Sequence, residues 1–358
     1  MDVLKIIFPT VLTFSIGIAI TPIFTQYFYK YKMWKKSPRT ESGDITSTHF
    51  VEIHNTSEET STPRVGGIII WVSVLFAVCV IFILSEIFTT GFFGGERSIF
   101  NQLNFFSRGQ TLVPLGAFFF AAFVGLADDS FHISGFGSYA KDSLVYRKVK
   151  IALVTLIGLV ISFWFYYKID FSSIAVPFAD RLELGIWFIP FFVIVVLATF
   201  STSVIDGIDG LAGGVMAIIF AAFSFIAFTN NQSDISALSG AICGAILAFL
   251  WFNVPPARFY MGETGMMALT VVLAVIAFLT DAVLILPIIA FPLVITSLSV
   301  IIQITSYKFF NKRRVFLVTP IHHHFQALGW SREKVVMRYW IVSVIFAIAG
   351  IIIYLISN

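Results

Sequence analysis

The composition of the chain is that of a membrane protein. Its 358 residues are 58% hydrophobic and 12% charged, with a mean hydropathy of +0.91, which excludes an ordinary soluble domain. Cys79 and Cys243 both lie inside apolar runs, so neither a disulfide framework nor a cysteine metal site is expected. The formal net charge of +3 carries little information, because in membrane proteins the placement of Lys and Arg matters more than their sum.

Apolar segments long enough to cross a bilayer, about 20 residues each, recur along the whole chain. The first lacks a basic leader and a small-residue cleavage site, so we expect a retained helix rather than a signal peptide. The third and eighth are short, which leaves nine or eleven spans as alternatives to ten. The sequence thus predicts an all-α integral membrane protein with about ten transmembrane helices, at Ile6–Tyr27, Val65–Ile87, Thr111–Leu126, Val149–Tyr166, Leu184–Val204, Leu211–Thr229, Ile235–Phe252, Met266–Thr280, Ala282–Ser306 and Val335–Ile356.

The basic residues divide unequally between the two sides that ten spans define. Eighteen of the 23 Lys and Arg residues fall on one side, which the positive-inside rule makes cytoplasmic, so both termini are expected outside. We expect one polytopic domain, residues 1–358, with cytoplasmic loops at about 28–64, 127–148, 205–210, 253–265 and 307–334. The simplest role of the basic loops is to fix topology and attract anionic headgroups.

Four polar clusters all fall on this basic side, which predicts one composite site at the cytoplasmic face. Asp128-Asp129 ends an apolar run, where carboxylates are expensive without a partner; capping of the next element is the alternative. Asp206 and Asp209 are one helical turn apart among glycines, which suits a metal or a phosphate-bearing ligand. A turn followed by a helix N-cap would have the same pattern.

The other two clusters contain aromatic and imidazole side chains. In the stretch from Asn253 to Gly265, Arg258 and Tyr260 suit a phosphate and a stacked base, unless Arg258 simply pairs with Glu263. The run His322-His323-His324 cannot bind one zinc ion from a helix, because neighbouring side chains diverge. Imidazoles lining a phosphate pocket are a better explanation, with a surface histidine run as the alternative.

Five short motifs in register resemble the polyprenyl-phosphate N-acetylhexosamine-1-phosphate transferases. The similarity extends from about Thr62 to Trp340, and the triple His points to the muramoyl-pentapeptide branch of that family. The motifs are Thr62-Pro-Arg-Val-Gly-Gly67, Asp128-Asp129, Asp206-Gly-Ile-Asp-Gly-Leu-Ala212, Asn253-x-x-Pro-Ala-x-x-Tyr-Met-Gly-Glu263 and Pro320-Ile-His-His-His-Phe325.

The resemblance implies transfer of phospho-MurNAc-pentapeptide from UDP-MurNAc-pentapeptide to undecaprenyl phosphate, giving lipid I and UMP for peptidoglycan synthesis. The expected setting is the bacterial cytoplasmic membrane, with Mg²⁺ as cofactor, the lipid bilayer as surroundings, no nucleic acid, and a homodimer allowed. The roles it implies are catalytic for Asp128, Asp129, Asp206 and His322; metal binding for Asp128, Asp129 and Glu263; and substrate binding for Asp209, Asn253, Tyr260, Gln303, His323, His324 and Lys148 or Lys150.

The sequence departs from the family pattern at four positions. Glu263 replaces the usual Asp on the metal side, Ser203 replaces an Asn, Tyr260 replaces the common Phe, and Gln326 replaces an acid after the histidines. These changes leave open a sister enzyme that transfers another N-acetylhexosamine-1-phosphate. An intramembrane prenyltransferase would need a second Asp-rich motif, and a secondary transporter would place its carboxylates near the bilayer midplane.

Overall fold

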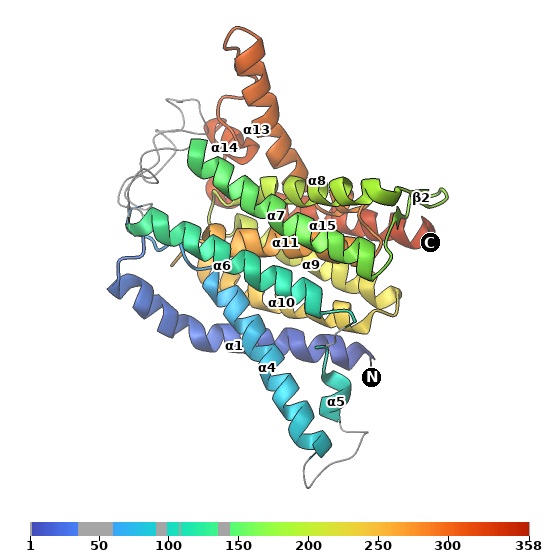
Figure 1. Ribbon diagram of the computed structural model, residues 1–358. Helices are drawn as coiled ribbons and strands as arrows, with labels where there is room; N and C mark the ends of the chain where they lie inside the picture. The colour runs from blue at the N-terminus through green and yellow to red at the C-terminus, as the bar shows by residue number, and fades with distance from the viewer. Residues whose placement is uncertain (1, 35–59, 91–98, 107–108, 135–143, 358) are drawn as a thin grey trace.

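A computed structural model describes residues 2–34, 60–90, 99–106, 109–134 and 144–357 of the chain (Figure 1). Much of the basic loops predicted at about 28–64 and 127–148 lies outside the described residues. The elements, in chain order, are α1 (Asp2–Lys30), α4 (Ile68–Thr90), α5 (Ile99–Leu103), α6 (Leu112–Ser134), α7 (Leu144–Lys168), β1 (Ser173–Ile174), β2 (Leu182–Glu183), η2 (Gly185–Trp187), α8 (Phe188–Ser201), η3 (Thr202–Ile205), α9 (Leu211–Thr229), α10 (Ser233–Asn253), α11 (Gly262–Leu279), α12 (Leu286–Ile289), α13 (Phe291–Phe309), α14 (Ile321–Ala327) and α15 (Arg332–Ser357).

The predicted spans are confirmed in number and type. Among the described residues, 10 helices are long and apolar enough to cross a membrane. Helices are expected there, since each backbone polar group in hydrocarbon must be hydrogen-bonded within its own segment. Besides helices, the described part of the chain contains a small antiparallel hairpin, β1–β2, in which Ser173 pairs with Glu183.

Two helix boundaries differ from those predicted by eight residues or more. The third span, expected to end at Leu126, continues as α6 to Ser134, so Asp128 and Asp129 lie within the helix rather than after it. Charges end the apolar run, but α6 continues as a helix that packs against α11, where Asp129 accepts a hydrogen bond from the Thr264 N–H. The ninth span, expected from Ala282, begins only at Phe291, because prolines at the starts of α12 and α13 begin new helices.

Helix α11 is the centre of the bundle. Of the ten spans it is the most deeply buried, and it packs against α6, α8 and α9. Around it, α10 packs against α9 and α1, and the Thr13 hydroxyl donates a hydrogen bond of 2.8 Å from α1 to the Ala241 carbonyl of α10. A fully packed α11 holds the polar residues at its start in a fixed place.

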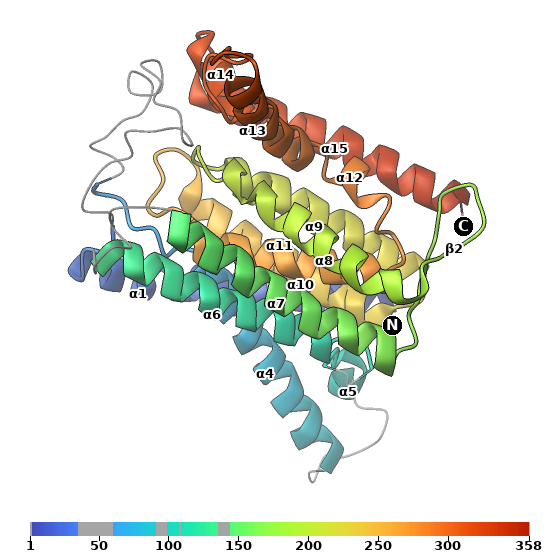
Figure 2. The same ribbon diagram turned by 45° about the horizontal axis from the view of Figure 1, so that its top comes forward.

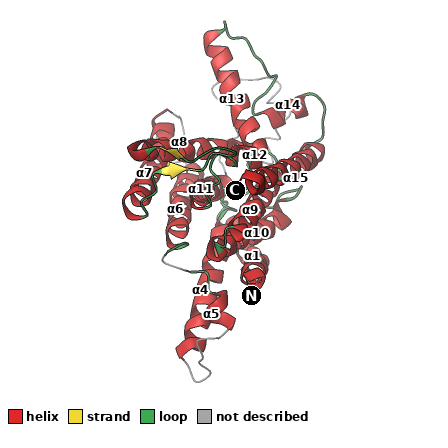
Figure 3. Ribbon diagram, turned by 90° about the vertical axis from the view of Figure 1, so that its right-hand side faces the viewer, coloured by secondary structure: helices red, strands yellow, loops and turns green. Residues whose placement is uncertain are grey.

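The helices form an elongated bundle with two strongly inclined members. Helices α4 and α13 leave the bundle in opposite directions (Figures 1 and 3). The turned view in Figure 2 shows α12, α13, α14 and α15 together along one edge. In Figure 1 both termini lie at the right-hand end, whereas α6 ends and α7 begins at the left-hand end. The predicted site and the termini are therefore at opposite ends of the bundle.

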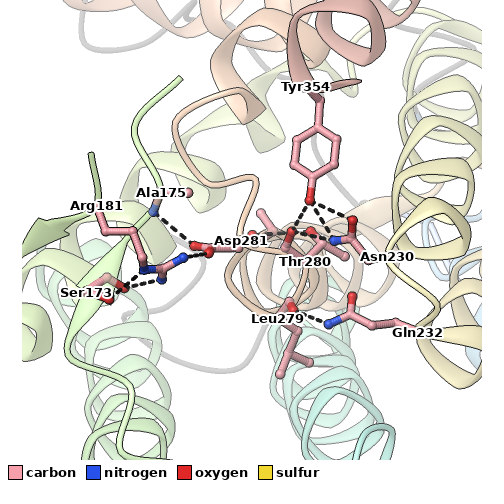
Figure 4. A network of polar contacts seen from close by, with 10 residues as sticks. Ser173, Ala175, Arg181, Asn230, Gln232, Leu279, Thr280, Asp281 and Tyr354 are labelled. Atoms are coloured by element: carbon pink, nitrogen blue, oxygen red, sulfur yellow. Dashed lines mark hydrogen bonds and ion pairs between the residues drawn. The ribbon is translucent and has the colours of Figure 1, made fainter. Parts of the chain in front are cut away.

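A polar network fastens the end of the bundle at which the termini lie (Figure 4). Asp281, just after α11, pairs with Arg181 of the hairpin. The Tyr354 hydroxyl of α15 contacts Asn230 Oδ1 at 2.9 Å and the Thr280 carbonyl at 3.0 Å. These contacts join α9, α11, α15 and the hairpin at the end of the bundle opposite the predicted site.

Candidate active site at the ends of α6, α7 and α11

Three helices bring a lysine between two carboxylates. Asp128 lies near the end of α6, Lys150 in the second turn of α7 and Glu263 in the first turn of α11. The Lys150 ammonium Nζ is 3.3 Å from Asp128 Oδ2 and 2.8 Å from Glu263 Oε1. Its side chain is only 14% exposed, so these attractions are weakly screened. The cluster is a shielded charged centre at the edge of the bundle.

Asp129 is the most deeply buried carboxylate of this centre, at 1% exposure. Its Oδ2 accepts hydrogen bonds from the Thr264 backbone N–H (2.8 Å) and the Thr264 hydroxyl (2.7 Å). This places the carboxylate at the N-terminus of α11, where the helix dipole favours negative charge. Its other oxygen, Oδ1, is buried and makes no hydrogen bond, and leaving such an atom unpaired is costly.

Asp206 reaches the same place from the turn after η3. Its Oδ2 accepts a hydrogen bond of 3.0 Å from the backbone N–H of Gly262. Gly262 has φ +68°, and a Cβ there would overlap the Arg64 carbonyl oxygen and the Asp129 carboxylate. A glycine is therefore needed for the segment containing Arg64, the end of α6 and the start of α11 to meet.

The histidines lie next to Asp206 through Gly207. A Cβ on Gly207 would lie 2.7 Å from His322 Nε2 and 3.0 Å from His323 Nε2, so the histidine helix α14 rests directly on this turn. His323 Nδ1 contacts Gln326 Oε1 at 2.7 Å. His322 is fully buried, and burial, reinforced by His323, holds the pKa of His322 well below its usual value. His322 is thus a neutral imidazole, and both its ring nitrogens lack a hydrogen-bond partner.

Other predicted substrate residues already have protein partners. Asn253 Oδ1 accepts a hydrogen bond from the Gly210 N–H (2.9 Å), and its Nδ2 donates to the Phe259 carbonyl (2.8 Å). Asp209 Oδ2 accepts from the Ala257 N–H at 3.1 Å. These contacts fasten the turn around Asp206 to the loop before α11, so Asn253 and Asp209 shape the site in this structure.

Gln303 and His324 hold the segment before the histidine helix. The Gln303 side-chain oxygen accepts from the N–H groups of Val315 and Phe316 at 3.1 and 3.0 Å. The Leu317 N–H donates to His324 Nδ1 at 3.2 Å, and burial lowers the pKa of His324. Both side chains are therefore engaged with the chain leading into α14.

The structure distinguishes the two candidate lysines. Lys150 pairs with the carboxylates, whereas Lys148 is exposed. Tyr260 lies in the loop before α11, where its backbone N–H bonds to the Pro63 carbonyl (2.8 Å) and its carbonyl accepts from the Gly66 N–H (2.9 Å). The motif from Thr62 to Gly67 is thereby laid against the start of α11.

Sequence reasoning gave no role to two residues at this centre. Thr264 directly follows Glu263 and anchors Asp129. Arg64 acts electrostatically on Asp129, and its Nε is buried without a hydrogen-bond partner. Arg64 lies inside the motif Thr62–Gly67, and Thr264 is the first residue after the motif that ends at Glu263. A buried carboxylate needs hydrogen-bond donors and a counter-charge, and this requirement could have pointed to both residues.

The donor chemistry of the cluster fits a hard divalent cation. Such ions prefer carboxylate oxygens, and Asp129 Oδ1 is a buried oxygen whose hydrogen-bonding capacity is unused. In the described part of the chain, however, no three His, Cys, Asp or Glu side chains converge as a ready metal site. Lys150 supplies the positive charge between Asp128 and Glu263 instead.

Comparison with known proteins places the chain in a family. The model of glycosyl transferase family 4 matches residues 111–281. The chain is 35% identical to a phospho-N-acetylmuramoyl-pentapeptide-transferase of Caldanaerobacter subterraneus subsp. tengcongensis, with 95% of this chain and 96% of the relative aligned. It is 33% identical to the enzyme of that name from Shouchella clausii (99% and 98% aligned) and 32% identical to that from Anoxybacillus flavithermus (97% of each). The chain therefore belongs to the family of the phospho-N-acetylmuramoyl-pentapeptide-transferases.

Proposed function

We propose that this chain transfers phospho-MurNAc-pentapeptide from UDP-MurNAc-pentapeptide to undecaprenyl phosphate, releasing UMP and forming lipid I for peptidoglycan synthesis. The observation that carries the proposal is the shielded cluster of Asp128, Lys150 and Glu263 at the ends of membrane helices, in a chain of this family. A cation facing carboxylates at the membrane edge suits a reaction between two anionic phosphates, one of them on a lipid.

The reaction requires no external oxidant, reductant or base. A phosphate oxygen of the lipid forms a bond to the phosphorus that carries the sugar, and the bond from that phosphorus to the UMP oxygen breaks. Because a phosphate monoester is already mostly dianionic near neutral pH, no proton has to be removed from the attacking oxygen. The protein therefore acts mainly by positioning the two phosphates and stabilising their charge.

The residues at the site have different roles in this positioning and charge stabilisation. Lys150, whose ammonium is the positive charge between the two carboxylates, would meet the phosphates. Asp129 is fixed by Thr264, and Asp206 is fixed by the Gly262 N–H, so these two hold the geometry. Neutral His322 can donate to or accept from a phosphate or sugar oxygen at the Gly207 turn.

We assign the cofactor as Mg²⁺, which Asp128, Asp129 and Glu263 would hold. When bound, the ion neutralises charge that builds on the phosphate oxygens. The site is assigned to the cytoplasmic face of the bacterial inner membrane, with both termini outside. A compartment-sensitive reporter fused after Asn358 tests the orientation, and activity of the reporter in the cytoplasm would contradict it.

The test of function offers two donors to the same membranes. Protein in membranes with undecaprenyl phosphate and Mg²⁺ receives either UDP-MurNAc-pentapeptide or UDP-GlcNAc, and UMP release is measured. We expect turnover of the first donor and loss of turnover in Asp128→Asn. Turnover of UDP-GlcNAc alone would replace the proposal by the sister enzyme of another envelope polymer, and a normal rate for Glu263→Gln would remove Glu263 from the metal site.

A further inference from the structure

A cavity lies outside the carboxylate cluster, between α13, α14 and α15. These helices form one edge of the bundle (Figure 2). This groove, of about 240 Å³, has walls that include Ile295 of α13, Phe325 of α14 and Val342 of α15. Its volume exceeds the roughly 150 Å³ that accommodates benzene in a protein interior. Its lining is almost wholly apolar, so it suits a hydrocarbon chain and not a nucleotide or a sugar.

The mouth of the groove is cationic. Trp330 stacks on Phe325 with ring centroids 4.8 Å apart. Over the Trp330 ring lie the guanidinium of Arg338, at 4.1 Å from the centroid, and the ammonium of Lys334, at 5.1 Å. Neither cation makes an ion pair with any carboxylate that the structure describes, and both side chains are exposed. Two uncompensated cations therefore stand beside an apolar slot.

The depth of the groove matches part of a lipid tail. Val335 and Val342 both line it and are seven positions apart on α15, which is about 10 Å along a helix axis. Arg338 lies between them and bends back toward Trp330 at the start of α15, as long basic side chains do at a membrane interface. The cations and the tryptophan thus lie at headgroup level while the slot extends into the hydrocarbon.

We propose that this groove binds an anionic phospholipid of the bilayer, with its phosphate at Arg338 and Lys334 and one acyl chain between α13 and α15. The charge of the mouth favours an anionic over a zwitterionic headgroup, by about fivefold per basic residue. The occupant is distinct from the lipid substrate, whose phosphate must reach Lys150.

The bound lipid also supports the histidine helix. Ile321 and Phe325 line the groove and flank His322 in α14, and the ring of Tyr339, another lining residue, packs edge-on against His322 at 6.4 Å. A filled groove keeps α14 pressed onto Gly207. This second part of the inference rests on the proposed function, because its readout is UMP release.

Binding is tested on the full-length protein in phosphatidylcholine nanodiscs that contain phosphatidylglycerol with a photoreactive acyl chain. We expect cross-links to peptides of α13, α14 and α15, and an about fivefold lower yield for Arg338→Gln. Lys308→Gln, an exposed cation on α13 away from the groove, should leave the yield unchanged. Val342→Trp should fill the slot and abolish the cross-links. Val344→Trp should not, because Val344 has a similar exposure (42%, against 37% for Val342) but lies outside the groove.

Three results would overturn the binding site. They are equal labelling by a photoreactive phosphatidylcholine, no effect of Arg338→Gln, and displacement of phosphatidylglycerol by equimolar undecaprenyl phosphate, which would make the groove a site for the substrate tail.

For the coupling between the groove and the histidine helix, UMP release should be faster with phosphatidylglycerol present and should fall in Val342→Trp but not in Val344→Trp. Unchanged UMP release in Val342→Trp would refute the coupling alone. Failure of the wild type to release UMP in any lipid would instead refute the proposed function, and the labelling would still decide the lipid site.

Discussion

Replacing Lys150 by Gln removes the cation that lies between Asp128 and Glu263 at 3.3 and 2.8 Å. At an effective dielectric constant of about 20, each of these attractions is worth about 5–6 kcal/mol before desolvation. Desolvation offsets much of this, and breaking a shielded pair leaves its carboxylates uncompensated, so we expect the variant to lose about 3 kcal/mol of unfolding free energy. UMP release should fall about 100-fold, as for loss of one group that stabilises developing charge.

The matched control is Lys148→Gln, because Lys148 is exposed two positions earlier on the same helix. It should change UMP release by less than about threefold, because an exposed charge contributes little interaction energy. Adding Glu263→Gln to Lys150→Gln should cost less stability than the two single changes together, since the double variant contains less uncompensated charge. Equal losses of activity in Lys150→Gln and Lys148→Gln would refute the reasoning.

Three further changes test the surroundings of the cluster. Thr264→Val removes the hydrogen bond from the Thr264 hydroxyl to Asp129 and should cost about 1–3 kcal/mol of unfolding free energy, with slower UMP release. Thr264→Ser keeps a hydroxyl and should restore both the stability and the rate. Unchanged stability and rate in Thr264→Val would contradict this prediction. Asn253→Ala should lower the thermal unfolding midpoint rather than raise the KM for the donor, because both ends of its amide bond the backbone; the reverse pattern would make Asn253 a substrate ligand. The pKa of His322 lies below its unfolded value, so the unfolded chain takes up the proton first and stability should decline as pH falls through about 6.5. His322→Gln should flatten this decline between about pH 7 and pH 5, and an unchanged slope would count against it.

The sequence predicted the spans well because their signal is local. A run of about 20 apolar residues specifies a membrane helix without reference to other helices. The prediction failed where packing decided the boundary. Asp128 and Asp129 end the apolar run, yet α6 continues to Ser134. Beyond Thr280 the sequence remains apolar, yet α13 begins at Phe291, after a proline-initiated short helix.

In the candidate site, the sequence predicted which residues take part better than it predicted what each of them does. The sequence identified Asp128, Glu263 and Asp206 by chemistry and motif, and the structure brings them together from the end of α6, the start of α11 and the turn after η3. The family resemblance implied that Asn253 binds substrate, but its hydrogen bonds in the structure are to backbone groups of Gly210 and Phe259. A pattern of residue types cannot tell a side chain that faces a ligand from one that fastens a loop.

The sequence by itself determined that this is a multi-pass helical membrane protein with its polar chemistry at one end of the bundle, because hydropathy and charge placement are local properties of the chain. Only the tertiary structure decided that Lys150 rather than Lys148 completes the cluster and that Thr264 anchors Asp129. Those contacts join residues 113 and 135 positions apart, and no local pattern reports them, since they exist only once α6, α7 and α11 have packed together.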